Sequence, residues 1–360
     1  MKILFTVTND LTYDQRMQRI CNSLASNGYD IELVGRLRGF SKPLVINTYK
    51  QTRLRCFFNR GKLFYVEYNL RLFFYLLFHR ADIICSIDLD TILPGYYVSK
   101  LKGIHFVYDA HEYFTEVPEV LKRPNVKAFW ERLEGHLLPK IKHAYTVNSS
   151  IAMLFEEKYK TPFEVIYNAP AYQEQKLENH FQDRILLYQG ALNASRGLTQ
   201  MIHAMQEIDA LFWIVGEGDL SLALRELVKS LNLDHKVIFK GMVSPAELPA
   251  ITKQATIGIN VSENAGLSYY YSLNNKCFDY MHAGLPSITN DFPEYRAINE
   301  KFGISLLTQC EEKLLINDLN KILSDKELYD NLKQNCLIAS EYYCWQREER
   351  KLLNFYAKFR

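Results

Sequence analysis

The chain lacks any apolar run long enough to cross a membrane as a helix. The nearest candidate, Phe73–Phe78, covers only six residues, whereas a spanning helix needs about 18–20. The amino-terminal segment begins like a signal peptide but turns polar at Thr8–Asp10, before any small-residue cleavage site. We therefore expect a buried first strand here. The missing signal peptide also argues against a two-lobed periplasmic binding protein.

The sequence also has few signs of a disulfide or zinc protein. Its seven cysteines are odd in number, and none form a CxxC pair, which favours a reducing, cytoplasmic setting. With 16 glycines and 11 prolines, the composition excludes collagen-like and low-complexity classes. A net charge of +2 gives no reason to expect a nucleic-acid partner.

The length of 360 residues, 48% of them hydrophobic, suits two domains with sizeable cores. In the first part, continuous apolar runs alternate with helical patterns, as in the βαβ units of a parallel sheet. The expected strands are Lys2–Thr8, Ile31–Val34, Ala81–Ile87 and Ile104–Tyr108, and the expected helices are 13–27, 92–101, 126–140 and 150–158.

The alternation stops at a polar stretch and then starts again. We expect residues 1–168 to form one Rossmann-like domain, 169–183 a linker and 184–344 a second Rossmann-like domain, followed by a final helix at 345–360. The expected strands of the second domain are 184–190, 210–215, 236–239, 256–261 and 285–289, with helices between them and two more near 311–340. Two doubly wound α/β domains in tandem predict ligand binding at the carboxyl ends of their strands.

Residues 53–80 combine basic and aromatic side chains with a single acid, Glu67. Such a composition suits the surface of an anionic membrane. A core helix between two strands, with an exposed basic face, explains the apolar residues slightly better. The positive excess keeps membrane-surface attachment as a hypothesis.

Two glycine-rich segments lie where a strand turns into a helix. In Gly190–Leu198 the glycines permit close approach of a ligand, the following helix offers free N–H groups, and Arg196 adds a phosphate contact. An ordinary βα turn with a surface arginine would have the same pattern. In Val215–Asp219, Gly216 and Gly218 indicate a tight turn near a ligand, but the full dinucleotide fingerprint is absent.

Lys276 and Asp279 lie three residues apart and share one face of a predicted helix that ends at Gly284. At a ligand site, the lysine suits a phosphate and the carboxylate suits a ribose diol. A surface ion pair is the alternative interpretation.

These motifs together resemble the retaining family 4 glycosyltransferases of the GT-B fold. The segment Asn275–Pro286 resembles the family's NKxFEYMAAGLPV stretch, and Gly190–Leu198, Ile214–Gly218 and Phe239–Val243 follow in the family's order. The first half adds Asp14–Arg16, Tyr108–Glu112 and Val165–Asn168. The final helix, with Trp345, resembles the one that crosses back to the first domain.

The resemblance implies roles for the second domain. Gly190 and Arg196 would cradle the donor diphosphate, and Gly216 and Gly218 would form a tight donor-binding turn. Asp279 would hold the ribose, and the base would pack near Gly241–Val243, with Val243 among the donor-binding residues. The family's first acid falls at Tyr271 and its usual phosphate arginine at Ala191. We expect Glu263 to substitute as a catalytic acid and Lys276 to supply the missing positive charge.

The resemblance also implies roles for the first domain. His111, after strand Ile104–Tyr108, would be catalytic, because a histidine there can hydrogen-bond a sugar hydroxyl or a developing charge. We place Asp14, Arg16, Asp109 and Glu112 on the acceptor side, with helix capping as the alternative for Asp14. We interpret the pair Asp88 and Asp90 as a loop lining the cleft or a helix cap, and we predict no metal.

The sequence thus predicts a metal-independent glycosyltransferase without a cofactor. It would move a sugar from a nucleoside diphosphate sugar to a hydroxyl acceptor with retention, in surface polysaccharide or glycolipid assembly. Its partners would be a sugar or lipid-linked acceptor and, through residues 53–80, the inner face of an anionic membrane. A nucleotide-sugar epimerase, an inverting transferase and a catalytically inert nucleotide-sugar-binding scaffold are the alternatives.

Overall fold

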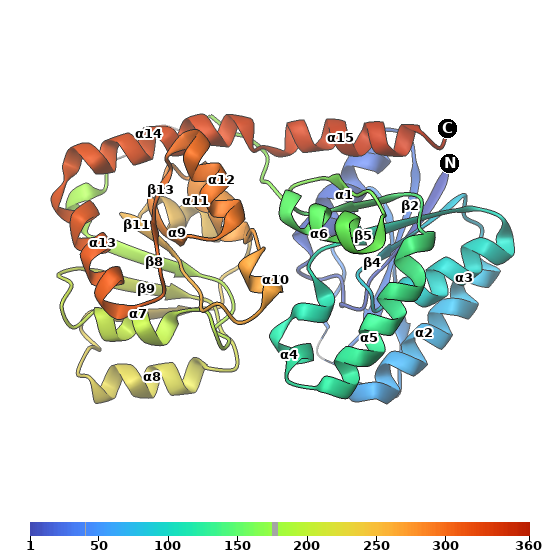
Figure 1. Ribbon diagram of the computed structural model, residues 1–360, viewed down its shortest axis with the longest axis horizontal. Helices are drawn as coiled ribbons and strands as arrows, with labels where there is room; N and C mark the ends of the chain where they lie inside the picture. Colours follow the sequence, from blue (N-terminus) through green and yellow to red (C-terminus); the bar gives the residue numbers. More distant parts are fainter. Residues whose placement is uncertain (40, 175–178) are drawn as a thin grey trace. The chain divides into compact units, whose positions relative to one another are not determined.

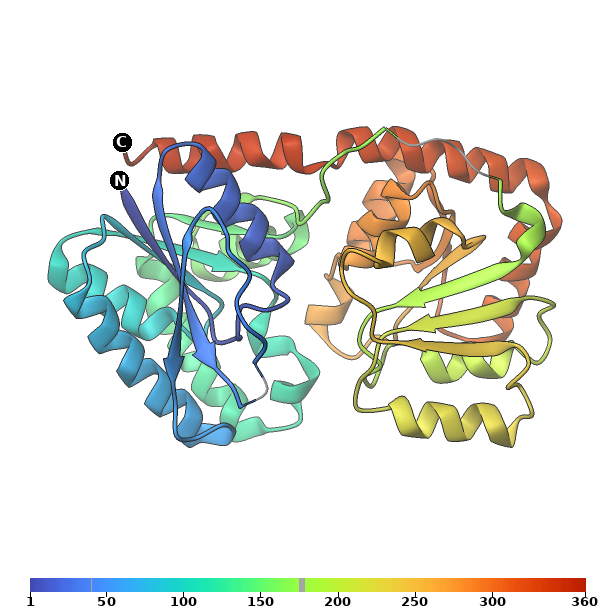
Figure 2. The ribbon, with the colours of Figure 1, turned by 180° about the vertical axis from the view of Figure 1, so that it is seen from behind.

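A computed structural model describes residues 1–39, 41–174 and 179–360 of the chain (Figures 1 and 2). They form two compact units. The first comprises Met1–Asn168 together with Glu348–Arg360, and the second comprises Ala169–Arg347. The segment 169–183, predicted to be a linker, belongs to the second unit. Residues 175–178 of that segment lie outside the described residues.

The first unit contains a parallel sheet of seven strands in the order β3-β2-β1-β4-β5-β6-β7. Its strands are β1 (Lys2–Thr6), β2 (Asp30–Leu37), β3 (Lys50–Arg55), β4 (Ile83–Ile87), β5 (His105–Ala110), β6 (Ala144–Thr146) and β7 (Glu164–Val165). Its helices are α1 (Gln15–Ser26), α2 (Gly61–Phe78), α3 (Ile92–Lys102), α4 (Pro118–Leu121), α5 (Pro124–Leu137) and α6 (Ser149–Tyr159), with the short 3-10 helices η1 (Phe114–Glu116) and η2 (Leu138–Lys140).

Helices cover both faces of this sheet. A Cβ atom on Gly95 of α3 would meet the side chains of Ile84 and Ser86. Cys85, between them on β4, contacts the Tyr145 hydroxyl, which in turn contacts that of Tyr356. Because successive side chains on a strand point to opposite faces, α3 lies on one face and the carboxyl-terminal segment on the other.

The second unit contains a parallel sheet of six strands in the order β10-β9-β8-β11-β12-β13. Its strands are β8 (Ile185–Gln189), β9 (Leu211–Val215), β10 (Val237–Gly241), β11 (Ile257–Asn260), β12 (Ser287–Asn290) and β13 (Ser305–Thr308). Its helices are α7 (Leu198–Ala204), α8 (Ser221–Ser230), α9 (Leu248–Lys253), α10 (Leu267–Tyr270), α11 (Asn275–His282), α12 (Pro293–Phe302), α13 (Glu312–Ser324) and α14 (Lys326–Tyr342), preceded by the 3-10 helix η3 (Phe181–Asp183).

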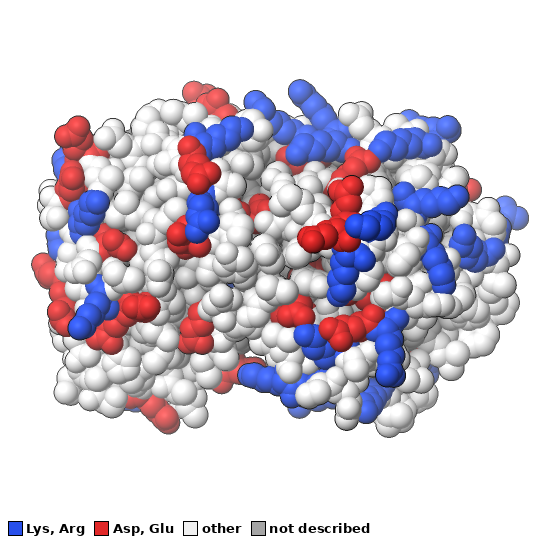
Figure 3. Space-filling view, viewed as in Figure 1, with Lys and Arg blue, Asp and Glu red and all other residues white. Residues whose placement is uncertain are grey.

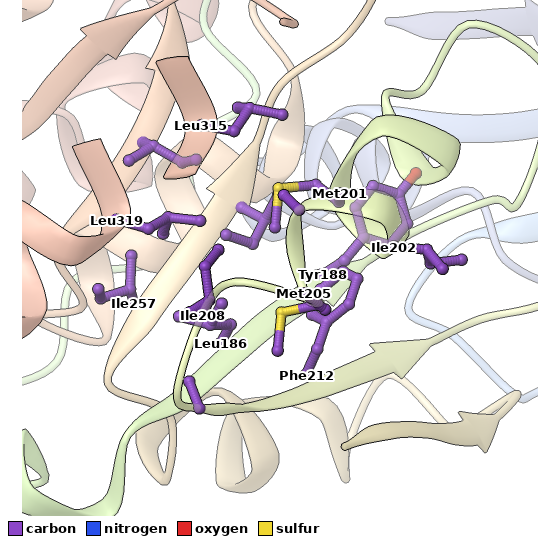
Figure 4. Packing of buried hydrophobic residues seen from close by; sticks show 14 of the residues in the cluster. Leu186, Tyr188, Met201, Ile202, Met205, Ile208, Phe212, Ile257, Leu315 and Leu319 are labelled. Atoms are coloured by element: carbon purple, nitrogen blue, oxygen red, sulfur yellow. The ribbon is translucent and has the colours of Figure 1, made fainter. Parts of the chain in front are cut away.

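The main core of the second unit lies between this sheet and helices α7 and α13 (Figure 4). Met201 of α7 and Met205, directly after it, pack with Leu186 and Phe212 of the strands and with Leu315 of α13, and all five are fully buried. This packing fixes the strand ends that carry the glycine-rich turns.

The last helix, α15 (Trp345–Ala357), runs from the second unit into the first (Figure 2). Its buried residues Leu352, Phe355 and Tyr356 pack in the first unit, where the Tyr356 ring lies 6.1 Å from that of Phe5. The first unit therefore needs the end of the chain to complete its core.

The sequence analysis overlooked several elements. Strand β3 is rich in charged and polar residues, as edge strands often are, and so has no apolar run. Strands β6 and β7 are too short to give a pattern, and α12 and β13 were not predicted. Within the described residues, no helix combines the length and apolar character that crossing a bilayer requires.

Candidate functional site

In both sheets the strand order reverses between the first and fourth strands of the unit, β1 and β4 in the first and β8 and β11 in the second. Loops that leave neighbouring strands at such a switch point diverge to opposite faces and leave a crevice at the carboxyl edge. The predicted site residues gather at these two edges.

In the second unit, three glycines stand at the ends of neighbouring strands. Gly190 and Gly216 directly follow β8 and β9, and Gly241 is the last residue of β10. Gly190 donates its N–H to the Val215 carbonyl (3.0 Å), and Gly216 donates to the Gly241 carbonyl (2.8 Å). Gly216 has a φ of +133°, and a Cβ atom there would lie 2.0 Å from the Gly190 carbonyl oxygen. Only glycine therefore fits at Gly216. Gly218 packs against the neighbouring turn, since its Cβ would lie 2.5 Å from the Asn193 side chain.

Glu263 lies beside the turn that carries Arg196. Its N–H donates to the carbonyl of Ser195 (3.0 Å), and its carboxylate accepts from the Gln200 side chain (2.9 Å). The side chain is exposed. The loop after β11 thus holds a carboxylate next to the phosphate cradle predicted from the sequence.

Arg196 and Lys276 form a pair of cations for which the described residues provide no carboxylate partner. Lys276 is only 8% exposed, and its ammonium lies 3.8 Å from the centroid of the Tyr188 ring. The Arg196 guanidinium lies over the Tyr269 ring at 4.8 Å, and its buried Nε has no hydrogen-bond partner among the described residues. Burial, with the Arg196 charge adding to it, lowers the pKa of Lys276 well below its ordinary value. A bound anion would neutralise both groups.

Asp279 is held by a residue that the sequence analysis did not assign to the site. The Gln189 side-chain N–H donates to the Asp279 carboxylate (2.8 Å), and its oxygen accepts from the Thr252 hydroxyl (2.9 Å). Gln189 is 3% exposed and stands at the end of β8. The sequence signal that could have identified Gln189 as a site residue is its position directly before Gly190. Lys276 and Asp279 both lie on α11, as predicted.

Two further predicted positions show mainly packing contacts. Val243 is partly buried against the cluster that contains Leu187 and Val215. Tyr271, which stands where the family has an acid, packs its ring edge-on against Tyr270 with centroids 4.9 Å apart. An aromatic side chain thus stands at the position of the family's first acid.

In the first unit, His111 is the end of a buried chain of charges. Its Nε2 lies 3.0 Å from Asp109, whose other oxygen lies 3.1 Å from the Arg16 guanidinium. Burial alone would lower the pKa of His111, but the charges of Asp109 and Asp88 outweigh burial and raise it to about 9. The imidazole is therefore protonated at neutral pH. Its side chain is 22% exposed, so it can reach a ligand.

Arg16 and Asp109, predicted on the acceptor side, are almost fully buried. Arg16 also donates to the Ile166 carbonyl (2.8 Å). Although burial alone would raise the pKa of Asp109, Arg16 and His111 lower it, so the carboxylate stays charged. These contacts give both residues a positioning role behind His111.

Asp14 uses both carboxylate oxygens within the protein. One accepts from the Met17 N–H (3.0 Å) and caps α1, and the other accepts from the Asn9 side chain (2.7 Å). The structure therefore shows the cap that the sequence analysis kept as an alternative. Glu112, also predicted on the acceptor side, is exposed next to His111.

Asp88 and Asp90 have perturbed pKa values, which the sequence analysis did not anticipate. The Asp88 carboxylate accepts a hydrogen bond from the backbone N–H of His111 (2.8 Å), and the Asp90 carboxylate accepts one from the Thr8 hydroxyl (2.6 Å). Burial, with Glu112 and Asp90 adding to it, raises the pKa of Asp88 to about 8, and burial raises that of Asp90 to about 6. Neither contact is a helix cap. Across the described residues, no group of three or more His, Cys, Asp or Glu has a metal-binding arrangement.

Comparisons with known proteins agree with this geometry. Residues 172–336 match the family model described as glycosyl transferases group 1. The second unit is therefore similar to group 1 glycosyltransferases. An uncharacterized glycosyltransferase of Methanocaldococcus jannaschii is 24% identical over 184 residues, which are 48% of this chain and 45% of that protein. The chain thus matches less than half the length of this relative.

Solved structures extend the similarity to the whole chain at the level of the fold. The sucrose-phosphate synthase of Thermosynechococcus elongatus has a TM-score of 0.84 and 16% identity, covering 99% of this chain and 98% of that one. HepE of Anabaena in complex with UDP-glucose has a TM-score of 0.76 and 15% identity, covering 99% and 100%. The fold is GT-B, and the resemblance predicted from the motifs is confirmed.

The group 1 match includes Arg196, Lys276 and Asp279, whereas His111 and its charge chain lie outside it. The residues predicted to bind the donor therefore lie within the matched region, and those of the first unit do not. The assignment of the first-unit residues is supported by their geometry and by the motif around Asp109–Glu112.

Proposed function

We propose that the protein is a glycosyltransferase that moves a sugar from a nucleoside diphosphate sugar to a hydroxyl acceptor. The observation that carries the proposal is the cation pair Arg196 and Lys276. Neither has a carboxylate partner among the described residues, and Lys276 is buried. Burying an unpaired ammonium group is costly unless a ligand compensates. A diphosphate, with its negative oxygens, is a ligand that both groups can share.

The other donor contacts follow from the same edge of the sheet. Asp279, fixed by Gln189, would accept hydrogen bonds from the ribose hydroxyls. The base would pack near Gly241–Val243 at the end of β10. HepE, a structural neighbour, was solved with UDP-glucose, which supports UDP-sugars as the first donors to test.

The chemistry requires the bond between the anomeric carbon and the diphosphate oxygen to break. The leaving diphosphate gains negative charge, which Arg196 and Lys276 would stabilise in place of a metal ion. The acceptor oxygen bonds to the anomeric carbon and passes its proton to an oxygen of the departing diphosphate. Protonated His111 would donate a hydrogen bond to a sugar hydroxyl or to the departing charge. Retention of the anomeric configuration is part of the proposal and follows the family resemblance.

The deciding measurement is calorimetric binding of UDP, GDP, ADP, CDP and TDP and their common sugars without added metal. We expect one nucleotide to bind, with roughly 10-fold or greater loss in Asp279→Asn, because hydrogen bonds to charged groups contribute about 1.5–3 kcal/mol. Asp234→Asn, an exposed change in the same unit, is the matched control. If no nucleotide binds, the proposal fails.

Tyr271 supports a second candidate, a nucleotide-sugar-binding protein without transferase activity. The family's acid at this place is replaced by an aromatic side chain packed on Tyr270. Nucleotide binding without sugar transfer or hydrolysis would favour this candidate. Release of free nucleotide with an epimerised sugar would instead indicate an epimerase.

We also propose that the enzyme acts in surface polysaccharide or glycolipid assembly, at the inner face of a membrane. A lipid-linked acceptor would suit a first unit with exposed aromatic and basic residues such as Phe57 and Arg60. Transfer of labelled sugar to a lipid extract, but not to soluble sugars, would support this acceptor class. Equal transfer to soluble sugars would argue against it.

A further inference from the structure

Helix α2 is apolar on the side that faces solvent. Its buried side carries a stripe at spacings of four residues, Phe64, Tyr68, Leu72 and Leu76. Its outer side carries a second such stripe, Val66, Leu70, Phe74 and Phe78, exposed by 66%, 56%, 47% and 77%. A helix on the surface of a soluble unit normally turns a polar face outward. The outer stripe therefore indicates a surface that another apolar phase covers.

The apolar surface continues onto α3. The two helices pack against each other, and the Lys102 ammonium of α3 donates to the Leu76 carbonyl near the end of α2 (2.7 Å). On α3, Tyr97 and Leu101 are 42% and 68% exposed. The outer face is thus shared by two neighbouring helices.

Positive charge surrounds this face. The only acid between residues 53 and 80, Glu67, is engaged by Arg71 (2.7 Å) and by the N–H groups of Phe57 and Phe58 (2.9 Å each). Four exposed cations have no carboxylate partner among the described residues, namely Arg55, Arg60, Lys62 and Arg80. They lie before, at the start of and after α2, so their long side chains can reach outward around the apolar stripe.

A pocket of about 180 Å³ opens beside α3. Its lining contains three lysines and two histidines and no acid, namely Lys100, Lys140, Lys142, His105 and His143. Burial lowers the pKa of His143, and His105, Lys358 and Lys142 lower it further, with Glu164 opposing. The Lys358 ammonium forms a hydrogen-bonded ion pair with the Glu164 carboxylate. In Figure 3, Lys and Arg side chains gather over α3 and toward the end of the chain. Such a pocket suits a phosphate group.

We propose that the α2–α3 face docks on an anionic phospholipid bilayer. The outer side chains of α2 enter the boundary between headgroups and acyl chains, and the basic pocket receives the phosphate of one lipid headgroup. Apolar residues ringed by cations are the arrangement that an anionic membrane surface attracts. A second copy of the same face would bring equal charges together, which disfavours self-association. Donor binding is independent of this inference, because its residues belong to the second unit.

The test is flotation of the full chain with vesicles of phosphatidylcholine plus phosphatidylglycerol, compared with phosphatidylcholine alone. We expect binding to the anionic vesicles only, with loss at high salt. The double variant Phe74→Ser with Phe78→Ser should weaken binding at least roughly tenfold. Leu222→Ser, an equally exposed apolar change on α8, should have no effect.

A second pair of variants isolates the pocket. Lys140→Gln with Lys142→Gln should weaken vesicle binding roughly 20- to 30-fold, because each lysine near a membrane surface contributes about fivefold. The control is the double variant Lys253→Gln with Lys313→Gln, which changes two exposed lysines of the second unit and should leave vesicle binding unchanged. Unchanged binding in the pocket variant would overturn the headgroup site.

Two other outcomes would overturn the docking surface itself. One is equal flotation with neutral vesicles. The other is a dimer in sedimentation velocity that Phe74→Ser with Phe78→Ser abolishes, which would identify a second copy as the occupant. Nucleotide binding is measured on every variant. If it persists while vesicle binding is absent, the membrane inference fails and the proposed donor site stands.

Discussion

The substitution Lys276→Met should move stability and nucleotide binding in opposite directions. Lys276 is 8% exposed, and Arg196 adds repulsion. The Lys276 ammonium lies 3.8 Å from the Tyr188 ring and has no carboxylate partner among the described residues. A group so placed weakens the folded unit and strengthens its complex with an anion. Methionine keeps an unbranched apolar stem and removes the charge.

The expected gain in stability follows from two opposing contributions. Removing the buried ammonium relieves a cost of several kcal/mol, and losing the contact with the Tyr188 ring gives back about 2 kcal/mol. We expect a net increase of about 1–2 kcal/mol in the free energy of unfolding. For a unit of this size, that raises Tm by about 2–8 °C.

The pH dependence gives an internal check. Because the pKa of Lys276 is lowered in the folded protein, the penalty is fully present below the folded pKa and disappears as pH rises toward the unfolded value of about 10.4. The Tm difference between Lys276→Met and the natural protein should therefore narrow between pH 7 and pH 10. Lys229→Met, an exposed lysine at the end of α8, should show neither the gain nor the narrowing.

Nucleotide affinity is measured on the same proteins by calorimetry. A charge-assisted hydrogen bond to phosphate is worth about 1.5–3 kcal/mol, so Lys276→Met should bind the diphosphate roughly 10- to 100-fold more weakly. If the variant is more stable yet binds with unchanged affinity, Lys276 is not a phosphate ligand. A lower Tm would refute the reasoning about its unpaired burial.

Four further predictions concern the rest of the two sites. Asp109→Asn should lower the pKa of His111 from about 9 toward its ordinary value, seen by NMR titration; an unchanged pKa would contradict the assigned contact. Because the folded pKa of His111 is raised, its contribution to first-unit stability is full below about pH 6.5 and is lost as pH rises through about 9. Urea unfolding across this pH range measures that contribution. Asp109→Asn should make the unfolding free energy less dependent on pH over the same range. Gly216→Ala should cost about 2–4 kcal/mol, whereas Gly39→Ala, with open space around it, should be near neutral; equal urea midpoints would refute the close approach at Gly216. Gln189→Leu should weaken nucleoside diphosphate binding without changing the pKa of His111; unchanged binding would show that Asp279 needs no support.

Much of the architecture was readable from local patterns. Continuous apolar runs such as Ala81–Ile87 predicted strands buried on both faces, and this one contains β4. The glycine-rich turns after β8 and β9 were found because glycine at a strand end is a local signal. Strand β3 was missed because an edge strand needs no apolar run. The membrane hypothesis for residues 53–80 came from composition, but composition could not tell which side of α2 faces outward.

The sequence by itself determined the alternation of strands and helices, the turns and the shared helix face of Lys276 and Asp279, because these depend on neighbours within a few residues. Only the tertiary structure decided how charges are compensated. Arg16 meets Asp109 across 93 residues of sequence, and Gln189 reaches Asp279 across 90. Burial and the pKa of a group depend on everything packed around it, which parallel strand order brings together from distant segments. The sequence could therefore identify Lys276 as a candidate phosphate ligand. Only the fold shows that it is buried, with no carboxylate partner in the part of the chain that the structure describes.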